Sequence, residues 1–243
     1  DIYEEAMHFP GMRVCQNHEP IKDIMRFLGY NIRYPEHWYG DFLAQLGSLW
    51  TAEKRVKGLC ERFGTNLVKG CFSEALGYGE RKRREVIKKL PETEVDVSMT
   101  GEVFDDFFPN GVPLSLKLSI KPEEGLIEFD YTDMPDQKAF GYNLTYATAR
   151  CSALQGTLPI LDPEIPTNDG ALKRIKVKLR EGSVAGIPNW PVGTSLATIA
   201  LCDEVTNLVF KAWAEVLPDQ AMAGMGEYNA ANFIGAGVSA SGE

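Results

Sequence analysis

The sequence predicts an α+β fold, in which a long antiparallel helix pair packs with a mostly antiparallel sheet and further helices. Three observations lead to this fold class. Apolar residues recur at helical spacing over residues 41–90, and the pattern then changes to alternation over residues 94–131. Helical spacing returns over residues 143–154 and 194–216. Separate runs of helix and strand of this kind are typical of the α+β class.

The first part of the chain is expected to be helical after an irregular start. A short helix is predicted over about residues 20–27. Asp41 then caps a long helix with an apolar stripe, and Gly64 ends it in the position of a C-cap glycine. A second helix follows over about residues 65–90. Because the link at Gly64 is short, the two helices are expected to form an antiparallel pair.

Four segments alternate between apolar and polar residues, which is typical of strands with one solvated face. They are residues 94–99, 114–120, 126–131 and 175–179. A Pro-Glu-Glu-Gly turn separates the second segment from the third. The first three segments therefore predict an antiparallel meander.

Two further helices complete the predicted elements. Asn143 is expected to cap a helix that runs to about Leu154. Thr194 or Ser195 is expected to cap a helix that ends near Val216.

We expect the chain to divide into two portions that form one continuous unit. Residues 1–91 contain the irregular start and the long helix pair, and residues 92–243 contain the sheet and the remaining helices. The chain has no initiator methionine and opens on DIYEEAMHFPGMRV, as if it were cut from the middle of a longer protein. We therefore expect a fragment or a processed piece.

Composition excludes several classes of protein. The net charge of −9 argues against a nucleic-acid partner, since neutralising phosphates requires a basic surface. No run of about 18 apolar residues occurs, and no basic region precedes an apolar one at the start, so neither a membrane span nor a signal peptide is expected. The five cysteines form no C-x-x-C pair, and four lie in apolar helical patterns. Buried, reduced thiols in a cytoplasmic protein are the expectation.

The densest group of carboxylates lies between the end of one strand and the start of a helix. Asp130, Asp133 and Asp136 occupy this position, where they form either a site or a solvated acidic turn. Two other turns carry short polar residues, which often serve the backbone alone. The candidate catalytic residues are Asp130, Asp133, Asn143, Asn168 and Asp169.

The sequence contains no recognised nucleophile motif, phosphate loop or zinc-binding cysteine pair. Its only histidines are His8, His18 and His37, and none has the spacing of a helical metal motif. A metal role for any of them would need ligands from elsewhere. We therefore expect no metal ligands within this chain.

Four segments resemble the hydantoinase B/oxoprolinase family. Residues 40–64 resemble its G-D-x-x-A-Q segment and the long helix that follows, and residues 126–137 resemble a family strand that ends in Asp. Residues 166–195 resemble the block from an Asn-x-Gly turn to a Pro-x-Gly-Ser loop, and the opening residues resemble the passage D-x-Y-x-E-G…P. Together these segments cover nearly the whole chain.

The resemblance implies one subunit of a multi-subunit, ATP-dependent enzyme. A partner subunit of hydantoinase A type would bind ATP and phosphorylate the enol or amide oxygen of the substrate. The subunit that this chain resembles would then handle the activated substrate. A divalent metal such as Mn, Zn or Mg is implied too, and the family's ligands lie N-terminal to the matched part. The remaining part of the subunit would therefore hold the metal.

Departures from the family pattern favour one branch. Tyr131-Thr132-Asp133 replaces the usual Ser-Gly-Thr turn, and the loop at residues 186–191 also differs. By similarity, these departures favour a biotin-independent acetone or acetophenone carboxylase, close to its large (alpha-type) subunit and assembled with further carboxylase subunits. The alternative is a hydantoinase, 5-oxoprolinase or lactamase subunit that opens a cyclic amide. A third interpretation is a non-catalytic interaction module. In the enzyme interpretations, we expect this chain to supply cavity walls and subunit contacts.

Overall fold

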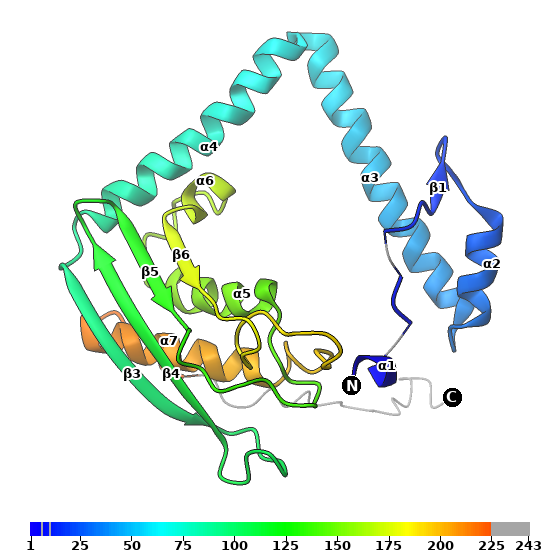
Figure 1. Cartoon of the computed structure of the whole chain (residues 1–243). Helices are drawn as coiled ribbons and strands as arrows, with labels where there is room; N and C mark the ends of the chain where they lie inside the picture. The colour runs from blue at the N-terminus through cyan, green and yellow to red at the C-terminus, as the bar shows by residue number, and fades with distance from the viewer. Residues whose placement is uncertain (6, 10, 225–243) are drawn as a thin grey trace, which may run out of the picture. The chain divides into compact units, whose positions relative to one another are not determined.

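The computed structural model describes residues 1–5, 7–9 and 11–224 (Figure 1). They belong to two compact units. One unit combines residues 1–5 with the described residues from Tyr78 onward, and the other is Met7–Gly77. The division into portions that we predict at residue 91 stays a prediction.

The smaller unit contains a short hairpin and helices. Its elements are β1 (Cys15–Gln16), β2 (Glu19–Pro20), α2 (Lys22–Tyr30), α3 (Pro35–Phe63) and the first half of α4 (Thr65–Ile87). Pro35 occupies the first turn of α3, where its missing N–H costs nothing, so this helix begins before the predicted cap at Asp41. Gly64 ends α3 with a φ of 84°, a conformation that favours glycine. Both long helices and the break between them are thus confirmed.

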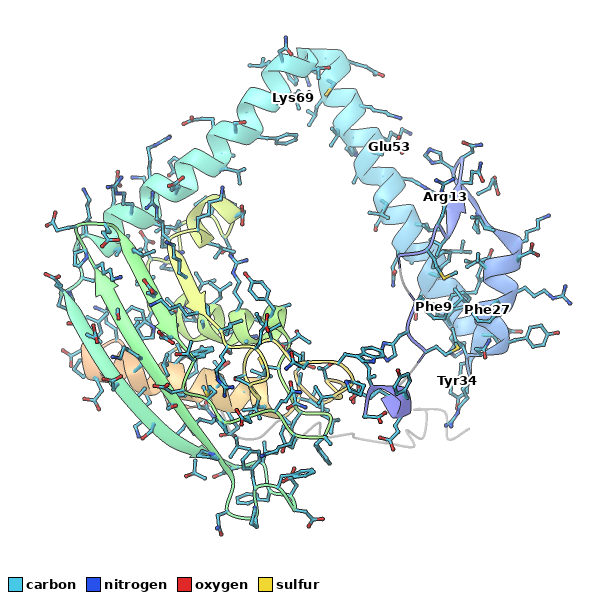
Figure 2. All side chains as sticks on the ribbon, viewed as in Figure 1. Phe9, Arg13, Phe27, Tyr34, Glu53 and Lys69 are labelled. Carbon is cyan, nitrogen blue, oxygen red and sulfur yellow. The ribbon has the colours of Figure 1, made fainter. Side chains whose placement is uncertain are left out.

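Few apolar side chains of the smaller unit are buried: Leu46 of α3 and Val68 of α4 are each 7% exposed. Helix α2 packs against α3, and Phe9 contacts Phe27 edge-on, with ring centroids 6.0 Å apart (Figure 2). Farther along, Leu49 is 64% exposed and Leu67 is 57% exposed. The helical spacing of apolar residues therefore predicts the helices correctly, although the described residues do not cover the whole apolar stripe.

The larger unit is built on a four-stranded sheet with the order β3-β4-β5-β6 (Figure 1). Its strands are β3 (Thr93–Gly101), β4 (Val112–Lys121), β5 (Leu126–Asp130) and β6 (Ile175–Lys178). The first three are antiparallel to one another, whereas β6 lies parallel to β5 at the edge of the sheet. The predicted meander and the mostly antiparallel sheet are confirmed. A parallel neighbour requires a crossover, and α5 (Tyr146–Thr157) and α6 (Asp169–Leu172) lie within it.

One face of the sheet packs against helices and forms the core. Helix α7 (Leu201–Val216) contacts β3 and β4, and it also packs on α5. Trp213 of α7 is fully buried and donates a hydrogen bond to Thr157 Oγ1 at 3.0 Å. The two helices approach closely because Gly156 has no side chain, and a Cβ at this position would overlap Val209.

The opposite face of the sheet is polar. Asp96, Lys117, Asp130 and Lys178 are directly opposite one another across the four strands, so their charges alternate in a row. The Lys178 Nζ and Asp130 Oδ2 atoms are 3.6 Å apart, and the Lys117 Nζ and Asp96 Oδ1 atoms are 3.8 Å apart. Opposite charges on neighbouring strands stabilise the pairing modestly. The single solvated face that alternation predicts is therefore present.

Two predicted helix starts differ from the structure. The cap of α5 is Thr145, not Asn143: its Oγ1 accepts a hydrogen bond from the Thr148 N–H, and the Thr148 Oγ1 accepts one from the Thr145 N–H. This reciprocal pair satisfies two N–H groups that the helix start leaves free. Helix α7 begins at Leu201, because the residues after Ser195 form turns instead.

The cysteines also differ from expectation. Only Cys202 is buried, whereas Cys71 and Cys151 are exposed, and all five thiols are free. Helical spacing places Cys71 and Cys151 close to apolar neighbours in sequence but does not show which side of the helix is covered. Among the described residues, no helix is both long and apolar enough to cross a bilayer.

Candidate functional site

A hollow of about 380 Å³ lies on the polar face of the sheet and contains two of the predicted site residues. Asp130 and Asp133 line it together with Asp96, Lys117 and Thr132. The side chain of Asp133 is exposed, whereas that of Asp130 is only 26% exposed. The two carboxylates thus share one hollow but differ in how much water reaches them.

Asp130 is already occupied by neighbours. Its Oδ1 accepts hydrogen bonds from the Thr132 N–H at 3.0 Å and from the Thr132 hydroxyl at 2.6 Å. Burial raises the pKa of the Asp130 carboxyl, but these hydrogen bonds and the charge of Lys178 outweigh it and hold the pKa below its ordinary value. Asp130 is therefore a fixed carboxylate that shapes the turn, whereas Asp133 is an exposed carboxylate of the hollow, as is Asp96 of β3.

Arg180 fixes the acidic turn, although the sequence did not single it out. Its Nε donates to the Thr132 carbonyl at 3.0 Å, and its Nη2 donates to the Met134 carbonyl at 2.7 Å. The same Nη2 lies 2.9 Å from the Asp136 carboxylate. The planar guanidinium can serve several acceptors at once, which a lysine cannot. The only signal for this role is the position of Arg180, two residues beyond the edge strand.

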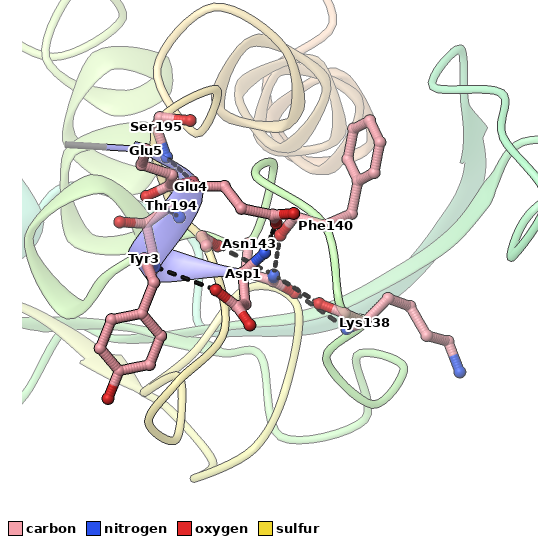
Figure 3. A network of polar contacts seen from close by, with 10 residues as sticks. Asp1, Tyr3, Glu4, Glu5, Lys138, Phe140, Asn143, Thr194 and Ser195 are labelled. Atoms are coloured by element: carbon pink, nitrogen blue, oxygen red, sulfur yellow. Dashed lines mark hydrogen bonds and ion pairs between the residues drawn. The ribbon is translucent and has the colours of Figure 1, made fainter.

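Asn143 acts as a clamp between two loops (Figure 3). Its side chain is fully buried. Its Oδ1 accepts a hydrogen bond from the Lys138 N–H, and its Nδ2 donates to the carbonyls of Lys138, Phe140 and Gly193 at 2.6–3.0 Å. Every polar atom of the side chain is thus directed at backbone. This geometry suits a structural role in holding the loops together.

The start of the chain reaches the same loops. The Glu5 carboxylate accepts hydrogen bonds from the Thr194 N–H at 3.0 Å and from the Ser195 N–H at 2.9 Å (Figure 3). Nearby, the Ile2 N–H donates to the Pro191 carbonyl at 2.9 Å. Gly193 allows this approach, since a Cβ there would overlap the Glu5 carboxylate.

Consecutive N–H groups directed at one carboxylate form an anion-binding concavity of the kind called a nest. Burial raises the pKa of the Glu5 carboxyl, but the hydrogen bonds from Ser195 and Thr194 outweigh it and hold the pKa below its ordinary value. Sequence reasoning missed Glu5. The available signal was that Glu5 and the loop at 193–195 both fall in family-like segments, at opposite ends of the chain.

Asn168 and Asp169 lie elsewhere. Asn168 caps α6 and accepts a hydrogen bond from the Ala171 N–H at 3.0 Å, while Asp169 is exposed and lies 3.7 Å from Lys173. Helix α6 precedes the start of β6, whereas Asp130 is opposite Lys178 at the end of β6. Three residues of strand span about 10 Å, so the structure does not bring these two residues to the hollow of Asp130.

The described residues do not fit the implied metal. They contain no group of three or more His, Cys, Asp or Glu side chains that could hold an ion. His18 lies 3.6 Å from Glu53 in the smaller unit, but no third ligand among the described residues joins them. The expectation that any metal ligands lie outside this chain stays a prediction.

Comparison with known proteins gives relatives along the whole chain. One subunit of a putative D-/L-hydantoinase from Pseudomonas sp. is 27% identical over 97% of this chain, which spans 41% of that protein. The delta subunit of acetophenone carboxylase from Aromatoleum aromaticum is 31% identical over 37% of this chain, which matches 13% of that protein. The chain thus spans about two fifths of the relative that it matches from end to end.

Two solved structures share the fold. The ATP-dependent caprolactamase of Pseudomonas jessenii superimposes with a TM-score of 0.79 and 18% identity, over 90% of this chain and 37% of that chain. A nucleotide-free acetone carboxylase gives a TM-score of 0.72 and 16% identity, over 88% of this chain and 30% of that chain. The family model for hydantoinase B/oxoprolinase matches residues 1–242. The chain therefore belongs to the hydantoinase B/oxoprolinase family.

Proposed function

We propose that this chain is part of one subunit of an ATP-dependent enzyme that acts on the carbonyl group of a small molecule. The observation that carries the proposal is the family match over residues 1–242. Relatives named as subunits of a hydantoinase, a caprolactamase and an acetophenone carboxylase support it. The substrates in these names share a carbonyl group, which belongs to an amide in hydantoin and caprolactam and to a ketone in acetophenone.

The first candidate reaction is the opening of a cyclic amide. Its support is the extent of similarity: the hydantoinase relative and the beta subunit of caprolactamase each match 97% of this chain. The second candidate is carboxylation of a ketone with bicarbonate and ATP. Its support is a local identity of 31% to an acetophenone carboxylase subunit, together with the unusual Tyr131-Thr132-Asp133 turn.

Both reactions face the same physical problem. An amide or enol oxygen is a poor site for reaction until its charge is stabilised, and ATP can supply the activation by phosphorylation. In the proposal, ATP binds to a partner subunit of hydantoinase A type, and divalent-metal ligands lie on the part of the subunit outside this chain. Reactive phosphorylated species hydrolyse in water, so the site must be closed to solvent.

The chain's own contribution is positioning and enclosure. Asp133 and Lys117 provide exposed charges of both signs in the hollow on the sheet face, and Arg180 fixes the turn that carries Asp133. Asn143 and Glu5 hold the neighbouring loops through backbone hydrogen bonds. These residues would set the wall of the site, whereas proton transfer by Asp133 is the one catalytic role that we assign.

The test is substrate-dependent ATP hydrolysis by the complete subunit co-purified with its partners. Hydantoin, 5-oxoproline and caprolactam form one set of substrates, and acetone or acetophenone with bicarbonate forms the other. Stimulation by the first set alone supports amide opening, and stimulation by the second set alone supports carboxylation. If the intact assembly hydrolyses ATP with neither set and modifies no member of either, the proposed reaction class is wrong.

A further inference from the structure

A second hollow, of about 420 Å³, is lined by residues of α5 and β6 and by residues at the end of α6. Four basic residues line it: Arg150 of α5, Lys176 and Lys178 of β6, and Lys173 directly after α6. Its only acidic lining residue is Glu128. The lining thus carries a net charge of about +3 in a chain whose net charge is −9. A local charge opposite to that of the whole chain concentrates anions at the hollow.

The acidic residue in the hollow is already neutralised. The side chain of Glu128 is 10% exposed, and its carboxylate lies 2.5 Å from Lys178 and 3.1 Å from Lys121. Hydrogen bonds from these two lysines outweigh burial and lower the pKa of the Glu128 carboxyl. Within the hollow, Glu128 therefore forms its ion pair with Lys178, and it does not neutralise the charges of Arg150, Lys173 or Lys176.

Two of the remaining cations have no acidic partner among the described residues. Lys173 lies 3.7 Å from Asp169, which satisfies it in part. Arg150 and Lys176 form no ion pair with any described carboxylate, yet both line the same hollow. Two cations that share a hollow repel each other, and an anion between them would remove that cost.

Lysines on an edge strand have an ordinary purpose, which is to prevent pairing with another sheet. Strand β6 is one of the two edge strands of the sheet, so this purpose explains Lys176 and Lys178. It does not explain Arg150, which lies on α5 and reaches the same hollow from outside the sheet. The lining also includes Leu172 and the exposed ring of Tyr146, whereas Ile175 is only 2% exposed and packs in the core. Convergence of separate elements on one hollow favours a binding site.

We propose that this hollow binds a small molecule with at least two negative charges, carried on phosphate or carboxylate groups. Arg150 would bind one oxyanion through its planar fork, and Lys176 would contribute a second point charge. Leu172 and Tyr146 would contact the apolar part of the ligand. This inference does not depend on the proposed reaction, because it concerns the edge of the sheet rather than the hollow that contains Asp133.

The test is a titration of the complete chain with pyrophosphate at constant ionic strength, followed by amide chemical shifts in NMR. We expect shifts confined to residues 146–150 and 172–178, with saturation. The double variant R150Q/K176Q is expected to bind at least about tenfold more weakly, since it loses two charged contacts. Shifts scattered over lysines throughout the surface, or none at millimolar pyrophosphate, would overturn the proposal.

A matched control separates a site from a general charge effect. Lys88 and Lys89 are exposed bases near the end of α4 and do not line the hollow, so K88Q/K89Q removes the same two charges elsewhere. Equal weakening in both double variants would refute the site. Succinate as a second probe then distinguishes the two ligand chemistries: tighter binding of pyrophosphate indicates phosphate groups, and tighter binding of succinate indicates carboxylates. R150K, which keeps the charge but loses the fork, should weaken binding by an intermediate factor.

Discussion

Replacing Glu5 by Gln tests whether the start of the chain holds the loop at Thr194 and Ser195. The substitution preserves size and one carbonyl acceptor, but it removes the charge and turns the second acceptor into an N–H₂ donor. One backbone N–H of the pair at Thr194 and Ser195 would then lose its partner. The loop should open more often in the variant while the rest of the unit stays folded.

The size of the effect follows from the hydrogen bonds. A hydrogen bond to a charged group contributes about 1.5–3 kcal/mol, and one between neutral groups contributes about 0.5–1.5 kcal/mol. Glu5 is partly exposed, so solvent reduces the difference, and we expect E5Q to lower the free energy of local opening by about 1–2 kcal/mol. That loss corresponds to roughly 5–30-fold faster exchange of the two amide hydrogens.

Amide hydrogen exchange at Thr194 and Ser195 is the assay, and E4Q is the matched control. Glu4 lies on the same short helix, but its carboxylate pairs with the α-amino group of Asp1 instead of the loop. We expect E4Q to leave both exchange rates at the wild-type value. If E5Q and E4Q give the same rates, the carboxylate does not hold the loop and the reasoning is refuted.

The pH dependence provides an independent check with a definite sign. The pKa of Glu5 is lowered in the folded chain, so its stabilisation is fully present above the unfolded pKa and disappears as the pH falls through the folded pKa. Protection of Ser195 in the wild type should therefore decrease in acid, below about pH 4. The protection in E5Q should be low at neutral pH already and change little over the same range.

Three other substitutions test the remaining structural claims. N143A removes four hydrogen bonds from a fully buried side chain and should lower the free energy of unfolding by about 2–4 kcal/mol in urea titrations. N168A removes the cap of a four-residue helix and should cost about 1 kcal/mol, so equal losses would contradict the clamp. G156A places a methyl group against Val209 and should lower the free energy of unfolding by about 1–3 kcal/mol. Adding V209A should restore part of that loss in the double variant, whereas purely additive losses would show that the two side chains do not meet. D133N should lower the turnover of the complete enzyme at least tenfold without changing the midpoint of thermal unfolding. D106N, at another exposed aspartate, is the control. Wild-type turnover in D133N would show that Asp133 is not catalytic.

Local patterns in the sequence predict the elements of this fold well. Alternation locates β3, β4 and β5 to within two residues at each end, because one solvated face leaves a period of two. Gly64 marks the break between α3 and α4 for a local reason, since a φ of 84° favours glycine there. These features depend on neighbours in sequence, and pattern reasoning can therefore reach them.

Burial and capping were harder to predict, because they depend on contacts that a pattern does not contain. Thr145 caps α5 since Thr148 is placed to reciprocate, whereas Asn143 is used by loops whose other half lies 50 residues farther on. Exposed Cys71 and Cys151 show the same limit: a helical stripe indicates an apolar side but does not identify what covers it.

In the candidate site, too, the residues close together in sequence were predicted, whereas those from distant parts of the chain were not. Asp130 and Asp133 were predicted to lie close together because they flank a strand end, and one hollow does contain both. The groups that hold the neighbouring backbone came from far away in the chain: Arg180 is 48 residues from Thr132, and Glu5 is 190 residues from Ser195. No periodicity connects such pairs, since they meet only after the sheet and its crossover have formed.

The distribution of contacts separates two kinds of polar residue in this chain. Asn143 and Glu5 direct their polar atoms at backbone groups, and Arg180 directs its own at backbone carbonyls and at Asp136, so the polar atoms of all three are engaged in fixing loops. Asp133 and Arg150 line hollows, and no described charged group pairs with either of them. Groups of the first kind should affect stability and loop order when they are changed, and groups of the second kind should affect turnover or ligand binding while the fold remains intact. If the two sets of substitutions had the same effects, neither the hollow that contains Asp133 nor the hollow that contains Arg150 would be a functional site.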